Sequence, residues 1–233
     1  MKKAKLAAAL GAGMLTISGT IMVAHSLASA TPAVPARTEA QAIVPVTEEP
    51  RAPSSVAFTL MIAPQGNSAR YLVQEQLVGF DLPSEAIGET RSVTGSIAFD
   101  SSGRIIPDAS RIQVGVASLR SDSERRDGFV RARVLETDRH PDVVFVPTSV
   151  QGLTLPLATS GTRSFTLSGN LTIRGVTRPV AWHVNATFTP GTIKGTGSTK
   201  FAFADFGLTQ PRVPVVLSVA DTIRLEHQFT LTR

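Results

Sequence analysis

The chain has 233 residues with no cysteine, 15 prolines and 18 glycines, and 42% of its residues are hydrophobic. This length fits one or two domains, and the lack of cysteine excludes disulfide scaffolds, thiolate zinc sites, iron–sulfur clusters and cysteine nucleophiles. The net charge is +5, but without the lysines at positions 2, 3 and 5 there are 20 basic and 18 acidic residues, a net charge of +2. We therefore expect no nucleic-acid partner.

The N-terminus has the order of a secretory signal. After Met1 come the three lysines, an uncharged run over residues 6–24 and the small-residue site Ala28-Ser29-Ala30. This order predicts a signal peptide over residues 1–30. The uncharged run is 19 residues long, close to the ~20 that span a bilayer, so an uncleaved membrane anchor is the alternative. Its many alanine, glycine, serine and threonine residues favour cleavage. Both interpretations place the rest of the chain outside the cytoplasm, periplasmic or secreted.

Residues 31–67 have the composition of a linker. Six prolines are spread among alanine, threonine, serine and glutamate, and no period of 2 or 3.6 residues is sustained. Such a stretch is typical of a mostly disordered spacer. The apolar run at 56–62 is the one part that suits an added edge strand. We expect a single folded domain over residues 68–233.

Alternation of apolar and polar residues dominates this domain. A two-residue period predicts strands with one buried and one wet face, and turn residues separate the runs as in antiparallel sheets. The predicted strands are residues 71–77, 93–99, 112–116, 143–150, 165–173, 180–188, 193–203 and 223–231.

One segment departs from this alternation and predicts a helix. Serine and aspartate at 121–123 precede a charged turn, which is typical of a helix start. Phe129, Val130 and Val134 then follow at helical spacing, and Pro141 opens the next strand.

About eight strands and one helix fit a closed barrel whose interior holds a small ligand. A two-sheet sandwich would show the same alternation. Glycines within strands mark bends or close approach of backbones and are used in barrel curvature. They favour the barrel here, and they are Gly95, Gly115, Gly169, Gly195 and Gly197.

Four motifs in order resemble those of one family. Residues 95–100 read G-S-I-A-F-D. Arg126-Asp127 is followed by L-E-T-D-R-H-P at 135–141 and by Phe145. Residues 169–180 read G-N-L-T-I-R-G-V-T-R-P-V, and residues 203–208 read F-A-D-F-G-L. These segments resemble the motifs G-x-I-x-F-D, R-D-x-H-L with a following Y-P-x-x-x-F, G-D-L-T-I-x-G-V-T-K-P-V and N-R-S-D-F-G-L. They are those of the YceI-like, polyisoprenoid-binding family, and the resemblance covers about residues 69–233.

The resemblance implies an all-β, lipocalin-like antiparallel β-barrel with a helix over one opening. Its relatives hold a long isoprenoid chain, such as a polyprenyl or quinone tail, and no catalytic step is assigned to the fold. The implied ligand is therefore an isoprenoid lipid or quinone, with no other cofactor. Relatives with this barrel often pair, so a homodimer is a further expectation. The chain departs from the pattern at Glu75, where histidine is usual, in a longer and more acidic link over 81–90, and at Phe129-Val130 in place of H-L.

An isoprenoid chain needs a long dry tunnel, because burying apolar surface drives its binding. The predicted ligand-binding positions are inward-facing apolar residues, together with one carboxylate. They are Tyr71, Val73, Glu75, Ile97, Phe99, Val114, Phe145, Leu171, Trp182, Val184, Phe201, Phe203 and Phe229.

Glu75 is the polar candidate among them. A buried carboxylate shifts its pKa or finds a partner, so Glu75 either receives a hydroxyl or quinone headgroup or forms a salt bridge with an arginine near the rim. Arginines at 125, 126, 131 and 133 surround the predicted helix. They form either a solvated face or a surface for anionic lipid, and membrane contact is expected in the second case.

The sequence has no signature of an enzyme. Histidine spacings that hold catalytic zinc are missing, and so are G-x-S-x-G and phosphate-binding loops. Two alternatives to a lipid-binding barrel remain. One is a tethered interaction module with a filled barrel. The other is an enzyme acting on a lipid or quinone head through Glu75 or His227. Alternation places His183 on the polar face of its strand and His227 on the apolar face, where a hydrogen-bonded core histidine is the more usual role.

Overall fold

The computed structural model describes residues 55–154 and 156–233. The predicted signal peptide and residues 31–54 of the predicted linker lie outside the described residues. In the part that is described, no helix is long and apolar enough to cross a membrane.

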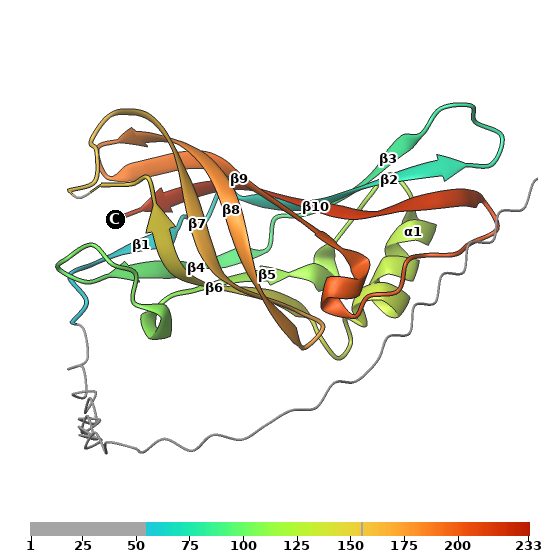
Figure 1. Cartoon of the computed structure of the whole chain (residues 1–233), viewed down its shortest axis with the longest axis horizontal. Coiled ribbons are helices and arrows are strands. Elements are labelled where there is room, and N and C mark those ends of the chain that lie inside the picture. Colours follow the sequence, from blue (N-terminus) through green and yellow to red (C-terminus); the bar gives the residue numbers. More distant parts are fainter. Residues whose placement is uncertain (1–54, 155) are drawn as a thin grey trace, which may run out of the picture. The chain divides into compact units, whose positions relative to one another are not determined.

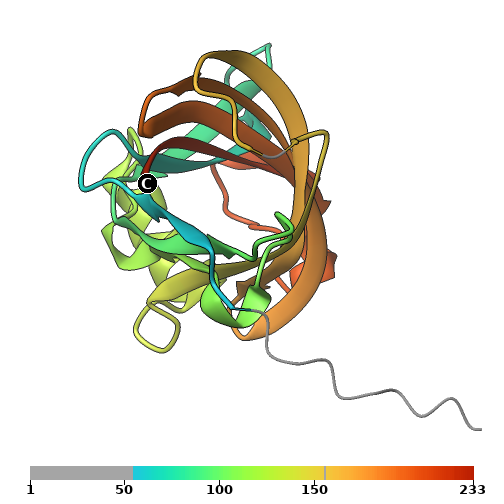
Figure 2. The same cartoon turned by 90° about the vertical axis from the view of Figure 1, so that its left-hand side faces the viewer.

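Ten antiparallel strands form one sheet, in the order β1-β4-β5-β6-β7-β8-β9-β10-β2-β3, with a further pairing between β1 and β10. This pairing closes β1 and β4 to β10 into a ring of eight strands, and Figure 2 shows the strands arranged around the barrel. The all-β barrel expected from the sequence is thereby confirmed. The strands, labelled in Figure 1, are β1 (Phe58–Ile62), β2 (Ser68–Leu77), β3 (Ser84–Thr90), β4 (Val93–Phe99), β5 (Arg111–Gly115), β6 (Asp142–Gln151), β7 (Gly161–Ile173), β8 (Val176–Thr189), β9 (Thr192–Ala202) and β10 (Val216–Thr232).

The long strand β10 explains how the ring closes. Its first part, from Val216 to Gln228, pairs with β2, and its last residues, Leu231 and Thr232, pair with β1. Since β1 also pairs with β4 along four residues, it is a member of the ring. The structured domain therefore starts earlier than the expected boundary at residue 68, because the apolar run at 56–62 supplies a ring strand where a linker with an optional edge strand was expected.

Strand β3 lies where the sequence indicated an acidic link. Its inward residues are Ala86, Gly88 and Thr90, all buried. These side chains are too small to give a hydrophobic signal, so the alternation in this strand was not recognised. The Tyr71 ring of β2 lies over Gly88, where a Cβ atom would collide with it. The absence of a side chain at 88 is thus what leaves room for the Tyr71 ring.

The helical segment lies where it was predicted, in two parts. The α-helix α1 (Glu124–Phe129) begins after Ser123, whose side chain accepts a hydrogen bond from the Arg126 N–H, and it continues as a π-helix over Val130–Leu135. Short 3-10 turns occupy Pro107–Ala109, Val116–Ser118 and Phe203–Phe206.

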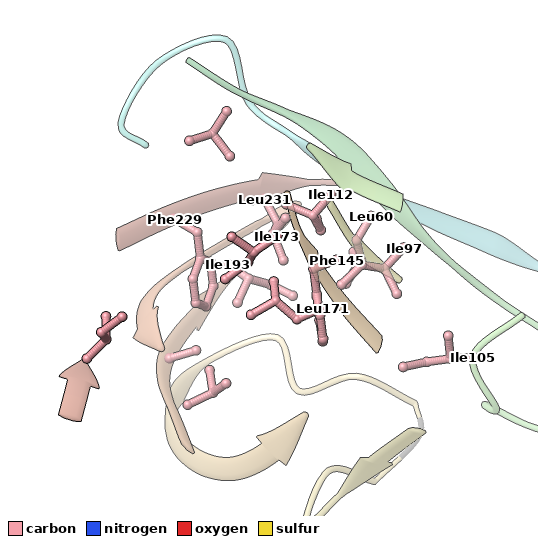
Figure 3. Packing of buried hydrophobic residues seen from close by; sticks show 14 of the residues in the cluster. Leu60, Ile97, Ile105, Ile112, Phe145, Leu171, Ile173, Ile193, Phe229 and Leu231 are labelled. Atoms are coloured by element: carbon pink, nitrogen blue, oxygen red, sulfur yellow. The ribbon is translucent and has the colours of Figure 1, made fainter. Parts of the chain in front are cut away.

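The barrel interior is apolar. The strands send every second side chain inward, as in β8, where Val184, Ala186 and Phe188 are buried and their neighbours exposed. Figure 3 shows how inward residues of several strands, such as Phe145, Leu171 and Phe229, gather within the ring. The two longest hairpin strands, β7 and β8, meet at Arg174-Gly175, where both residues have positive φ as a two-residue turn requires.

Candidate functional site

The ring encloses a cavity of about 470 Å³. This lies within the ~300–1,000 Å³ that is usual for ligand sites. Side chains from all ten strands line it, and the helical segment and residues 211–216 complete its wall. Many of its lining residues, such as Leu171 and Phe229, also belong to the hydrophobic core.

All thirteen residues singled out from the sequence line this cavity. Leu171 and Val184 are almost fully buried, whereas Tyr71, Trp182 and Phe201 are half-buried and present part of their surface to the interior. The structure thus brings the predicted positions together. That each of them contacts a ligand stays a prediction.

Besides β3, with Ala86 and Thr90, sequence reasoning missed two further parts of the wall. Leu60 and Ile62 enter from β1 at two-residue spacing, which was a strand signal that the surrounding prolines obscured. The second part is the segment 211–215 before β10, with Pro211, Val213 and Val215 among its lining residues. The sequence of this segment has no periodic pattern, so only the structure shows that it lines the cavity.

The end of the cavity under α1 is polar. Glu75 is 8% exposed, and its carboxylate accepts a hydrogen bond from the Arg126 guanidinium at 2.7 Å. Arg126 also contacts Asp122. The salt bridge near the rim, one of two roles expected for Glu75, is therefore formed. A ligand headgroup at this end would meet two charged side chains that already bind each other.

Burial and neighbouring charges shift the pKa values of two side chains at this end of the cavity, Arg126 and Tyr71. Burial lowers the pKa of Arg126, but the carboxylates of Glu75 and Asp122 outweigh this and hold the pKa above its ordinary value. Burial also raises the pKa of Tyr71 to about 12, so its phenol stays protonated. Tyr71 and Arg126 can therefore both donate hydrogen bonds at this end of the cavity. Neither side chain loses its proton near neutral pH.

The remaining arginines of the helical segment divide into two kinds. Arg131 donates a hydrogen bond to the Leu119 carbonyl and is held in place. Arg125 and Arg133 are exposed. Part of this cluster is therefore structural, and part faces solvent.

The cavity wall contains a histidine. His227 of β10 lines the wall, and burial lowers its pKa to about 4, so its ring is neutral at physiological pH. Sequence reasoning placed it correctly on the apolar face of its strand but expected a satisfied core histidine. His183, by contrast, lies on the exposed face of β8 as predicted. Among residues 55–154 and 156–233, no group of three or more metal-ligating side chains is placed to hold a metal ion.

Comparison with known proteins agrees with this architecture. The model of a family described as the YceI-like domain matches residues 53–231. A UPF0312 protein of Azotobacter vinelandii is 30% identical over 189 residues, which cover 74% of this chain and 93% of that protein.

Two solved structures share the fold. One is a polyisoprenoid binding domain from Saccharophagus degradans implicated in plant cell wall breakdown, with a TM-score of 0.57 at 12% identity over 76% of this chain and 99% of that one. The other is BcnA of Burkholderia cenocepacia, with a TM-score of 0.51 at 15% identity over 70% and 95% of the two chains.

Proposed function

The chain belongs to the YceI-like domain family, and from this premise we propose that it is an exported lipid-binding protein. It holds a long isoprenoid chain, of polyprenyl or quinone type, inside its barrel for carriage, storage or stress protection. The observation that supports this most directly is the cavity itself, lined by apolar side chains from every strand of the sheet.

The form of the cavity suits a chain better than a compact polar molecule. It extends from the charge pair of Glu75 and Arg126 under α1 to Leu60 and Ile62 of β1. Burial of apolar surface at about 25 cal/mol per Å² is the main source of affinity for such a ligand. The solved relative from Saccharophagus degradans is described as a polyisoprenoid binding domain, which supports the same ligand class here.

Export rests on the sequence. The basic, apolar and small-residue segments of residues 1–30 are those of a signal peptide. A lipid carrier outside the cytoplasm would need to take its ligand from a membrane, and exposed apolar side chains near the cavity support such a contact.

Apolar side chains stand exposed at the turn between β2 and β3, which lies beyond α1 in Figure 1. Phe80 is 65% and Leu82 78% exposed, and Leu217 of the adjoining β10 is 66% exposed. Val215, which is also exposed, lines the cavity as well. This apolar patch (Val78, Phe80, Leu82, Val215 and Leu217) is where we place contact with lipid, in place of the arginines near α1.

The test is to express the full chain with export, purify it and record native mass spectra before and after organic extraction. A bound species with a polyprenyl fragmentation series supports the proposal and identifies the ligand. A ligand-free mass, with no uptake of added quinones or polyprenols, overturns it. That result would favour the second candidate, a tethered interaction module, for which the exposed apolar patch would be the contact surface, including that of a homodimer.

A further inference from the structure

Two polar atoms in the apolar wall of the cavity have no protein partner. They are Nε1 of Trp182 and Nε2 of His227. Both are buried, and within the described residues neither has a hydrogen-bond partner. Both residues line the cavity. A buried donor or acceptor that stays unpaired costs about 1–3 kcal/mol, so two such atoms in one cavity call for an explanation.

The two side chains lie close to one glycine. His227 of β10 is directly opposite Gly197 of β9. On the other side of β9, a Cβ atom at Gly197 would lie 3.4 Å from the Trp182 ring. Gly197 therefore forms a floor without a side chain on the inner face of β9, against which the Trp182 ring packs from β8, and His227 lies beside it on β10.

This place is far from the charge pair. His227 of β10 lies opposite Ala69 of β2, and Glu75 is six residues farther along β2. At ~3.3 Å per residue the separation along the strand is roughly 20 Å. Arg70 and Glu226 also line the cavity and are bound to each other at 2.7 Å. As a closed pair they leave no net charge on this part of the wall to balance a charged ligand group.

The hydrogen-bonding chemistry of the two atoms defines which ligand group they can bind. The indole N–H is a donor and never an acceptor, and a neutral imidazole nitrogen is either one or the other. His227 is neutral because burial lowers its pKa to about 4. An oxygen that receives the Trp182 N–H and meets His227 Nε2 would satisfy both atoms, provided that it carries no charge.

We propose that Trp182, His227 and the floor at Gly197 form a subsite for an uncharged oxygen, a carbonyl or hydroxyl, carried by the lipid in the cavity. This inference rests on the proposed lipid-binding function and adds to it the polarity and position of one ligand group. The subsite orients the lipid with its oxygen deep in the barrel, away from the charge pair of Glu75 and Arg126.

The test uses three probes that share one C20 prenyl chain: a methyl ketone, the corresponding alcohol, and the hydrocarbon that lacks oxygen. We expect the ketone or the alcohol to bind the wild-type protein about tenfold more tightly than the hydrocarbon, as one buried hydrogen bond provides. In Trp182→Phe and in His227→Leu, the ratio of the affinity for the ketone or alcohol to that for the hydrocarbon falls to about one. The control variant His183→Gln, altered on the exposed face of β8, keeps the wild-type ratio.

A second measurement needs no variant. Trp182 is the single tryptophan of the chain, so the indole N–H band in a resonance Raman spectrum belongs to this residue alone. The band shifts on binding of the ketone or alcohol and stays in place with the hydrocarbon. Equal affinity for all three probes, or an unchanged band, overturns the subsite and leaves the lipid-binding function standing. Failure of all three probes to bind overturns both.

Discussion

The lowered pKa of His227 lets us predict how the stability of the ligand-free protein depends on pH. The pKa of His227 is about 4 in the folded protein, because burial disfavours the charged ring, against an ordinary value of 6.5. Between these values the unfolded chain binds a proton that the folded chain does not. Stability therefore falls as the pH drops from about 6.5 to about 4, and this contribution levels off below the folded pKa.

The magnitude follows from the two pKa values. One pKa unit corresponds to about 1.4 kcal/mol, so the His227 contribution to the unfolding free energy decreases by about 3 kcal/mol between pH 7 and pH 4. Urea unfolding at a series of pH values measures this for the wild type, for His227→Leu and for the exposed-face control His183→Gln. The difference between wild type and His227→Leu should change by that amount across the range, and the control should follow the wild type.

A parallel pH dependence in the wild type and His227→Leu would refute this reasoning. It would mean that the ring is protonated in the folded protein, through water or through a rearranged wall. The inference that His227 meets an uncharged ligand group would then lose its electrostatic support.

Three other predictions concern the salt bridge, the apolar patch and one surface turn. Arg126→Gln leaves the Glu75 carboxylate buried without its partner and should lower the unfolding free energy by about 3 kcal/mol, most of which the double variant with Glu75→Gln should recover in the same urea titration. The double variant Phe80→Ser and Leu82→Ser should slow transfer of a fluorescent polyprenol from vesicles several-fold while leaving affinity in detergent unchanged, and an unchanged transfer rate would remove the patch from the exchange route. Hydrogen bonds from a serine hydroxyl and from backbone N–H groups lower the pKa of Asp100 to about 2, so Asp100→Asn should destabilise the protein at pH 5. That difference should disappear as the pH falls through 4 toward 2, and a deficit that persists at pH 2 would contradict the assignment.

Strand faces were the most predictable feature of this protein. A two-residue period places alternate residues on opposite faces without any knowledge of which strands pair. For this reason positions such as Val184, Phe203 and Phe229 were assigned to the interior correctly, and all thirteen chosen residues line the cavity. Ordered motifs such as that at 169–180 indicated the family, which the comparisons confirmed.

The sequence was less informative where small residues or prolines mask the period. Strand β3 turns Ala86, Gly88 and Thr90 inward and so carries no hydrophobic signal. Strand β1 is short and lies between prolines at 53 and 64, so it resembled part of the linker. Both are held by pairing with distant strands, since β1 joins β4 and the end of β10.

By itself the sequence determined the all-β class, the inward faces of most strands and an apolar interior, because these depend on local periodicity. Tertiary structure alone decided which groups meet inside. Glu75 and Arg126 lie 51 residues apart in the chain and meet only because α1 lies over the end of β2. Trp182 and His227 flank Gly197 only because of the register of β8, β9 and β10. Such encounters depend on strand register and ring closure, which contacts across the whole domain establish.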